Sequence, residues 1–351
     1  MFETCSHNTE SESNRTGSDE KSRAQFKMKR ARCIVTYSTL SATAIRRAIG
    51  LQYEFSGRLD CVFFNRGVSD TYLLSCDGRR FALKLHRANW RSQEAILAEI
   101  DALSHFGHKG VEVAMPIRRK DGNWLTEVPA PEGRRLAVLF EWAPGQTPTY
   151  TDAQHCLKYG RLVARLHLAG DSLTSSKYRP KMDADYLLKY PMSRVASRLP
   201  ESPSVQKRFE ELCTHILNRL NEAETQLKDW GFCHGDIYPN NACVDGDTLT
   251  LFDFDFCGSG WRIYDLATYR WEARRQGVED NAWEPFIRGY CEIRPGGSDS
   301  LEFIGLFMAI RHIWTAAHWV GLSPELGISF PPAEFLNELV PFCERLESVA
   351  H

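Results

Sequence analysis

The stretch FCHGDIYPNNACVDGDTLTLFDFD, residues 232–255, is the most informative part of this chain of 351 residues. It contains the tripeptide His234-Gly235-Asp236, then Asn241 five residues after the aspartate and Asp253 twelve residues after the asparagine. The turn dipeptide Asp245-Gly246 separates two short apolar runs, which predicts a β-hairpin. We therefore expect a polar loop held on a rigid β segment, with several oxygen-bearing side chains close together.

The residue types in this stretch suit one kind of chemistry. Protein-kinase catalytic loops and metal-binding strands use the same types at nearly the same spacing. Phosphoryl transfer needs an oriented hydroxyl group, divalent cations and cationic groups over the phosphates. Asp236 and His234 are therefore our catalytic candidates, and Asn241 and Asp253 are our candidates for Mg²⁺ ligands, because their oxygens are hard. The structural alternative is a polar loop that merely precedes a hairpin.

A site of this kind also needs a lysine on a strand far upstream. Residues 81–86, FALKLH, supply one at Lys84. Side chains alternate between the two faces of a strand, so Phe81 and Leu83 are predicted to enter one core while Ala82 shares the opposite face with Lys84. A small alanine beside the lysine leaves room for adenine while the ammonium group reaches the phosphates of ATP.

The lysine needs an anionic partner, and Glu99 is the first candidate. Glu99 lies three residues after Ile96 and four before Leu103, so it is predicted to share the core-facing side of its helix. An unpaired carboxylate there would be costly, which favours a Lys84–Glu99 ion pair, with Glu94 as the second candidate. Between the first two strands, Ser69 lies in a predicted turn that covers the phosphates.

The chain divides into three parts. Residues 1–33 are poor in aliphatic side chains, so we expect a disordered tail. Residues 34–142 are strand-rich, which predicts a small antiparallel-sheet lobe with one helix that binds the nucleotide. Residues 143–351 predict a larger, mainly helical lobe with the catalytic loop and the acceptor site, in an α+β fold. The predicted strands are 60–65, 71–75, 81–86 and 136–142; the predicted helices are 91–106, 152–168, 203–228, 261–276, 283–293, 301–320 and 332 to the C-terminus.

Composition excludes several classes of protein. The 43 basic and 45 acidic residues give a net charge of −2, so we expect no nucleic-acid partner and no membrane surface. Apolar stretches such as 304–310 fall far short of the about 18 residues that a membrane span requires. We expect no secretory signal, because the first thirty residues hold no continuous apolar segment. The 11 cysteines are scattered without a C-x-x-C pair, which favours reduced thiols in a cytoplasmic protein.

Several motifs occur in an order known from one group of enzymes. They are VLFEWAPG (138–145), GRLVARLH (160–167), HGDIYPNN (234–241), LFDFD (251–255) and YDLA (264–267). The chain resembles the aminoglycoside phosphotransferase and choline kinase superfamily, whose members have a kinase-like fold of two lobes. Its C-terminal part, with RHIWTAAHW (311–319), looks most like the homoserine kinase and stress response kinase A branches.

The resemblance implies roles for individual residues. Glu141 and Trp142 would present backbone groups to adenine at the hinge between the lobes. Asp236 would be the catalytic base, and Asn241 and Asp253 would bind Mg²⁺. Asp265 in YDLA would be structural and would brace the loop by hydrogen bonds. The loop over the phosphates departs from the kinase pattern because it lacks a full G-x-G-x-x-G.

The sequence is less informative about the acceptor. The residues that follow the metal strand are basic and aromatic: Trp261, Arg262, Arg270, Trp271, Arg274 and Arg275. They favour a neutral or carboxylate-bearing small-molecule hydroxyl acceptor over a polycation. Two alternatives stay open: a Ser/Thr protein kinase resembling stress response kinase A, and a catalytically silent nucleotide-binding protein. A monomer and a homodimer are both compatible with the sequence.

Deleting residues 1–30 should leave the melting temperature and the nucleotide affinity unchanged, because this segment has almost no aliphatic side chains to bury. Thermal denaturation of the full-length and truncated proteins measures both, with and without Mg-ATP. A large loss of melting temperature in the truncated protein would contradict the predicted disordered tail.

Overall fold

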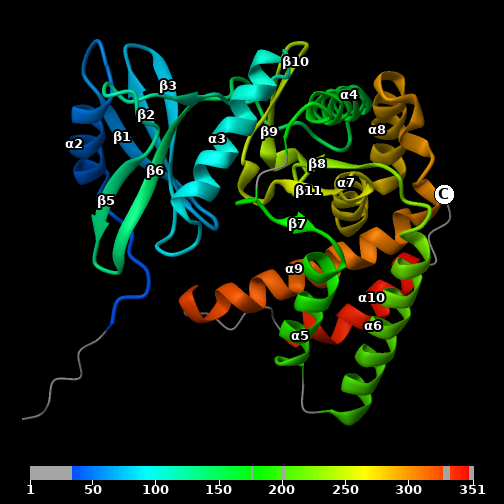
Figure 1. Cartoon of the computed structure of the whole chain (residues 1–351). Coiled ribbons are helices and arrows are strands. Elements are labelled where there is room, and N and C mark those ends of the chain that lie inside the picture. The colour runs from blue at the N-terminus through cyan, green and yellow to red at the C-terminus, as the bar shows by residue number, and fades with distance from the viewer. Residues whose placement is uncertain (1–33, 175–176, 200–201, 327–332, 348–351) are drawn as a thin grey trace, which may run out of the picture. The chain divides into compact units, whose positions relative to one another are not determined.

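The computed structural model describes residues 34–174, 177–199, 202–326 and 333–347, and Thr36–His351 form one compact unit (Figure 1). The predicted tail, residues 1–33, lies outside the described residues.

The N-terminal part is a six-stranded antiparallel sheet in the order β1-β2-β3-β6-β4, with β5 also paired to β6. All four predicted strands are present, and the short strands β4 and β5 were not predicted. The strands are β1 (Asp60–Arg66), β2 (Asp70–Cys76), β3 (Arg79–Leu85), β4 (Pro116–Ile117), β5 (Thr126–Ala130) and β6 (Gly133–Glu141).

The two faces of the sheet pack against different helices (Figure 1). Helix α2 (Ala42–Gln52), which the sequence analysis did not predict, covers one face, where Phe81, Leu83 and Leu85 form a core with α2 residues. Helix α3 (Gln93–His108) is the predicted helix, and the Ser92 side chain caps its first turn by accepting a hydrogen bond from the Ala95 amide at 3.2 Å. Ala82 lies on the α3 side, so the predicted alternation along β3 is confirmed.

The C-terminal part is mainly helical, as predicted. Its helices are α4 (Ala153–Gly170), α5 (Tyr190–Ala196), α6 (Pro203–Ala223), α7 (Ile263–Arg275), α8 (Glu279–Ile293), α9 (Ile304–Leu326) and α10 (Ala333–Glu347). Helix α5 and the π-helical turn Asp185–Lys189 before it were not predicted. The predicted hairpin is confirmed as β9 (Ala242–Asp245) and β10 (Thr248–Leu251). A second small sheet joins β7 (Lys181–Met182), β11 (Gly258–Trp261) and β8 (Trp230–Cys233).

Helices α4 and α8 cross with their backbones in close contact. A Cβ atom on Gly160 would lie 1.9 Å from the Phe286 carbonyl oxygen, and one on Gly289 would lie 2.2 Å from the Leu157 carbonyl oxygen. Only glycine allows this approach at these two positions. The contact matters for the site because α4 carries His167, whose ring bonds to the Tyr290 hydroxyl of α8 at 2.8 Å and to Asp265 at 3.1 Å.

A fully buried arginine ties the N-terminal sheet together. The Arg135 guanidinium donates to the Asp70 carboxylate at 3.0 Å, to the His86 carbonyl at 2.9 Å and to the Ser38 carbonyl at 3.0 Å. The Tyr37 hydroxyl donates to the other oxygen of Asp70 at 2.5 Å. These contacts join three strands to the segment before α2. Within the described residues, every helix is too short or too polar to cross a bilayer.

Asp70→Ala should lower the free energy of unfolding by about 3–5 kcal/mol, because it leaves the buried Arg135 charge without its closest carboxylate. Glu127→Ala is the matched control: the Glu127–Arg134 pair is more than half exposed and should contribute at most about 1 kcal/mol. Urea denaturation of both variants measures the difference. Equal effects of the two substitutions would contradict the anchoring role of Arg135.

Candidate active site

Asp265 holds the backbone of the loop that carries Asp236. The two oxygens of this fully buried carboxylate accept hydrogen bonds from the backbone amides of His234 and Gly235, both at 2.7 Å. Burial opposes the charge, but the hydrogen bond from His167 keeps the pKa of Asp265 below its usual range. Gly235 has φ of +83°, which favours glycine, and a Cβ atom there would lie 2.5 Å from the Phe256 carbonyl oxygen. The structural role implied for Asp265 therefore agrees with the geometry.

His234 lies in this loop as a structural residue. Its Nε2 donates to the Phe252 carbonyl at 3.1 Å, and its Nδ1 accepts from the Asp236 amide at 3.2 Å. The ring is fully buried, so neither nitrogen is left to reach a reacting group. These contacts favour a structural role for His234 over the predicted catalytic one, because the imidazole joins the loop to the segment that leads to Asp253.

Asp236 and Asn241 are bonded to each other. The Asn241 Nδ2 donates to Asp236 Oδ2 and to the Asp236 carbonyl, both at 2.9 Å. Because both contacts use the amide nitrogen, the Oδ1 atom of Asn241 is the one available to a cation. The other carboxylate oxygen of Asp236 accepts from Arg311 Nη2 at 2.5 Å, a contact that the sequence analysis did not predict.

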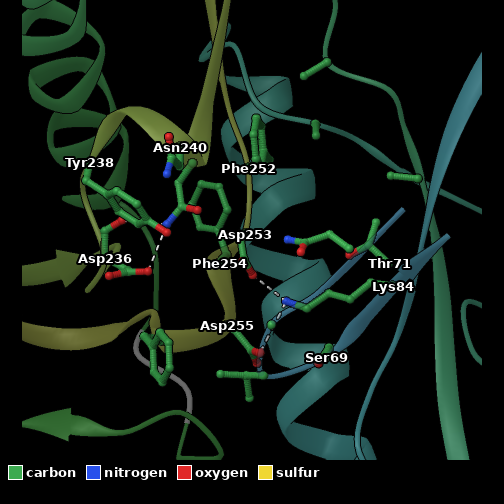
Figure 2. Close-up of a pocket in the computed structure, with 18 of the residues that line it drawn as sticks. Ser69, Thr71, Lys84, Asp236, Tyr238, Asn240, Phe252, Asp253, Phe254 and Asp255 are labelled. Carbon is green, nitrogen blue, oxygen red and sulfur yellow. Dashed lines mark hydrogen bonds and ion pairs between the residues drawn. The ribbon is translucent and has the colours of Figure 1, made fainter. Parts of the chain in front are cut away.

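Lys84 lies among three carboxylates, of which Figure 2 shows those of Asp253 and Asp255. Its Nζ is 2.8 Å from Asp253 Oδ1, 3.5 Å from Asp255 Oδ2 and 3.7 Å from Glu99 Oε1. Burial disfavours the ammonium, yet these carboxylates hold the pKa of Lys84 above its usual range. The predicted Lys84–Glu99 pair is present, and Glu94, the second candidate, is exposed at the start of α3.

Asp253 has a left-handed backbone, with φ of 61° and ψ of 64°, which is rare for a non-glycine residue. The strained conformation turns the chain at the end of the hairpin, so that Phe254 enters the core while Asp253 stays partly exposed toward the cavity. Strain of this kind occurs often at functional sites. Asp253 is therefore held at the place where Lys84 and Asn241 line the same space.

Two arginines that the sequence analysis did not single out support the turn after Asp253. Arg179 Nη2 donates to the carbonyls of Phe254 and Asp255, both at 2.7 Å, and Arg91 Nη2 donates to the Asp255 carbonyl at 2.8 Å. Burial would raise the pKa of Asp255, but Lys84 and His86 and these arginines lower it. Asp255 is therefore a buried anion that forms an ion pair with Lys84.

A cavity of about 840 Å³ brings the predicted residues together. Of the described residues named as site candidates, Ser69, Lys84, Glu99, Glu141, Trp142, Asp236, Asn241 and Asp253 line it, and His234 does not. We call the part lined by the strands the sheet half. Among the described residues, no group is a hydrogen-bond partner for the buried Ser69 Oγ there. The Glu141 amide already donates to the Met115 carbonyl at 2.8 Å, so this amide is not available to a base.

The part of the cavity lined by α7 and α9, the helical half, is aromatic and has paired charges. It contains Thr268, Trp271, Glu272, Arg275, Arg311, Trp314, Thr315, His318 and Trp319. Arg275 pairs with Glu272 at 3.1 Å, and Arg311 pairs with Asp236. Burial and the nearby Arg311 lower the pKa of His318 to about 3, so its ring is uncharged at neutral pH.

Only two of the six basic and aromatic residues considered for the acceptor line this cavity, namely Trp271 and Arg275. The others have structural partners. Arg262 pairs with Asp171 and Asp229, both Arg270 and Arg274 pair with Glu279, and Trp261 is buried in the core. The sequence did not reveal these pairings because the carboxylates for Arg262 lie on distant segments.

Comparisons with known proteins agree with this geometry. The profile of the phosphotransferase enzyme family matches residues 60–304. An uncharacterised protein of Deinococcus radiodurans is 32% identical over 88% of this chain and 92% of its own length. The homoserine kinase of Brucella anthropi is 24% identical over 85% of this chain and 91% of its own length.

A solved structure of amicoumacin kinase with AMP-PNP and Ca²⁺ superposes with a TM-score of 0.71 at 20% identity and covers 88% of this chain and 93% of that one. This similarity confirms the predicted α+β, kinase-like fold with two lobes. Together with the family profile, which spans the sheet, the catalytic loop and the helices as far as α9, it shows that the chain belongs to the phosphotransferase enzyme family.

Proposed function

We propose that this protein is a kinase that transfers the γ-phosphoryl group of ATP to the hydroxyl group of a small molecule. The observation that supports this most is the single cavity in which Lys84, Asn241, Asp253 and Asp236 all lie. These residue types supply a phosphate-binding cation, two hard oxygen ligands and a base, which is the set that phosphoryl transfer requires.

The sheet half of the cavity suits the nucleotide. Ala82 and Phe140 provide an apolar surface for adenine, while the hinge residues Glu141 and Trp142 lie at its edge. Lys84 faces the phosphates, and the unpartnered Ser69 hydroxyl is a donor for a phosphate oxygen. Because three carboxylates surround this ammonium group, the polyphosphate would bind together with a divalent cation.

Asn241 and Asp253 fit a Mg²⁺ ion. Mg²⁺ is usually bound by one or two carboxylates together with substrate phosphates and water. The Asn241 side chain bonds to Asp236 through its amide nitrogen, which leaves Oδ1 for a cation. The Asp253 carboxylate is partly exposed. Among the described residues, no cluster of three or more histidine, cysteine or acidic side chains is arranged to hold a metal, so nucleotide phosphates would complete the coordination. When bound, the ion neutralises charge that develops on the phosphates.

Asp236 is placed to act on the acceptor. Its carboxylate lies in the cavity at the junction of the catalytic loop with α9. The acceptor hydroxyl oxygen forms the new bond to phosphorus as the bond to the leaving ADP oxygen breaks, and Asp236 takes the hydroxyl proton. The charge of Asp236 also orients the hydroxyl before transfer.

The helical half favours an uncharged or zwitterionic acceptor. The carboxylates of its described residues, Glu272 and Asp236, are each paired with an arginine, which disfavours a polycation there. Relatives such as homoserine kinase and amicoumacin kinase are named for small molecules. Measuring ADP release with neutral, zwitterionic and polycationic alcohols, beside a protein pool, tests the acceptor class and the alternative of a protein kinase.

Mg-ATP should raise the melting temperature. A ligand that binds only the folded state stabilises it by RT ln(1 + [L]/Kd), about 2.7 kcal/mol at a hundredfold excess over Kd. Thermal denaturation with ATP plus Mg²⁺, ATP plus chelator and Mg²⁺ alone measures the shift and its metal dependence. A folded protein whose melting temperature is unchanged at millimolar Mg-ATP would refute nucleotide binding.

Asp236→Asn and Asp253→Asn should separate chemistry from binding. Asp236→Asn should reduce transfer by about 10²–10⁴-fold, the usual contribution of a general base, with little change in Mg-ATP affinity. Asp253→Asn should weaken both, because it removes a charged ligand from the ion. Transfer assays and Mg-ATP titrations of both variants measure these effects, with circular dichroism as the folding control.

Full transfer activity in Asp236→Asn would show that the catalytic assignment is wrong. Equal loss of Mg-ATP binding in the two variants would favour a structural role for the loop. It would also favour the alternative that the protein is a catalytically silent nucleotide-binding protein.

A further inference from the structure

Arg311, on the inner face of α9, is bonded to the loop that carries Asp236. Its Nη2 donates to Asp236 Oδ1 at 2.5 Å, and its Nη1 donates to the Gly235 carbonyl at 3.0 Å. Arg311 is only 5% exposed, and it lines the same cavity as Asp236. One guanidinium therefore contacts both the side chain of the proposed base and the backbone of the residue before it.

Aromatic side chains hold the guanidinium in place. Its central carbon is 5.0 Å from the ring centre of Trp314 and 5.4 Å from that of Trp271. The His318 ring stacks on Trp314, with ring centres 5.3 Å apart and an interplanar angle of 1°. Because α7 supplies Trp271 and α9 supplies Trp314, the planar cation is held by both helices. A lysine ammonium cannot reproduce this planar, two-pronged contact.

The Asp236 carboxylate is thereby held at both oxygens. Oδ1 accepts from Arg311 and Oδ2 accepts from Asn241, so the side chain cannot rotate without breaking one of the two bonds. The arrangement also compensates the charge of a carboxylate whose side chain is only 14% exposed. Burial opposes the charge of Arg311, but Tyr264 and Asp236 keep its pKa above the usual range, so the guanidinium is charged.

We propose that Arg311 is a positioning residue, which acts through Asp236 by fixing the direction in which that carboxylate meets the acceptor hydroxyl. The proposal rests on the proposed function. It gives α9 a part in orienting the base, through a residue that lies 75 positions after Asp236 in the sequence. The position of a reacting group strongly affects the reaction rate, since a displacement of about 1 Å can lower that rate by about 10²-fold.

A double-mutant cycle with Asp236→Asn tests the proposal. Arg311→Met should lower the turnover number by about 10²-fold, with little change in the KM for Mg-ATP or for the acceptor. In the Asp236→Asn background the same change should cost almost nothing further, because the residue through which it acts is already altered. Arg311→Lys should stay impaired, and guanidinium ion at a concentration that does not denature the protein should restore part of the activity of Arg311→Ala.

Arg262→Lys is the matched control, since Arg262 is a buried arginine of the same lobe that pairs with Asp171 and Asp229 and does not line the cavity. It should lower stability without lowering the turnover number. A variant that keeps the rise in melting temperature with Mg-ATP is folded. If Arg311→Met does not keep it, Arg311→Lys replaces Arg311→Met in the double-mutant cycle.

Three results would overturn the proposal: full turnover in the folded Arg311→Lys and Arg311→Met variants, additive losses in the double mutant, or a change confined to the acceptor KM. The last would make Arg311 a substrate-binding residue. These results differ from a failure of the proposed function. In that case the melting temperature of the unaltered protein would not rise with Mg-ATP, and the unaltered protein would not transfer phosphate.

Discussion

The cluster of one ammonium and three carboxylates around Lys84 is the interaction on which the rest of the site depends. Glu99 belongs to the sheet lobe, whereas Asp253 and Asp255 follow the hairpin of the helical lobe. Buried charges are costly unless they are well paired. The lobes must therefore meet with strand β3, helix α3 and the end of β10 in one relative position, and this position also defines the cavity between them.

The apolar framework supplies the precision that such charges need. The close crossing of α4 and α8 at Gly160 and Gly289 holds His167, which bonds to Asp265, and Asp265 in turn holds the backbone of the catalytic loop. The chain of contacts runs from close helix packing to the loop backbone and ends at the Asp236 side chain. The position of the Asp236 carboxylate therefore depends on helix packing that does not involve Asp236 itself.

The charges of the cavity are arranged differently in its two halves. In the sheet half, Lys84 lies among three carboxylates, and the Ser69 hydroxyl has no hydrogen-bond partner among the described residues. In the helical half, each arginine is neutralised by a carboxylate, and the remaining surface is mostly aromatic and hydroxyl-bearing. These charges suit a nucleotide that binds together with a divalent cation in the sheet half and an acceptor without net charge in the helical half.

The sequence by itself determined the strands and helices with clear periodicity, the pairing of Lys84 with Glu99 and the grouping of Asp236, Asn241 and Asp253. Strand alternation around Lys84, helical spacing around Glu99 and the motif from Asp236 to Asp253 are visible in the order of the residues. The pairing of Lys84 with Glu99 followed from the cost of an unpaired carboxylate on a core-facing helix side. Helix α2 was missed although its buried Ile45 and Ile49 recur at helical spacing. The strands β4 and β5 were missed because β4 has only two residues and a proline interrupts β5.

Only the tertiary structure decided what the isolated polar residues do. Arg311 and Arg179 meet the catalytic segment across separations of 75 and 76 residues, and no local pattern marks an arginine for such a contact. The motif predicts a catalytic role for His234, whereas its burial and its two backbone partners favour a structural one. The physical reason is that burial and long-range ion pairs depend on which segments pack together, and spacing along the chain does not encode this directly.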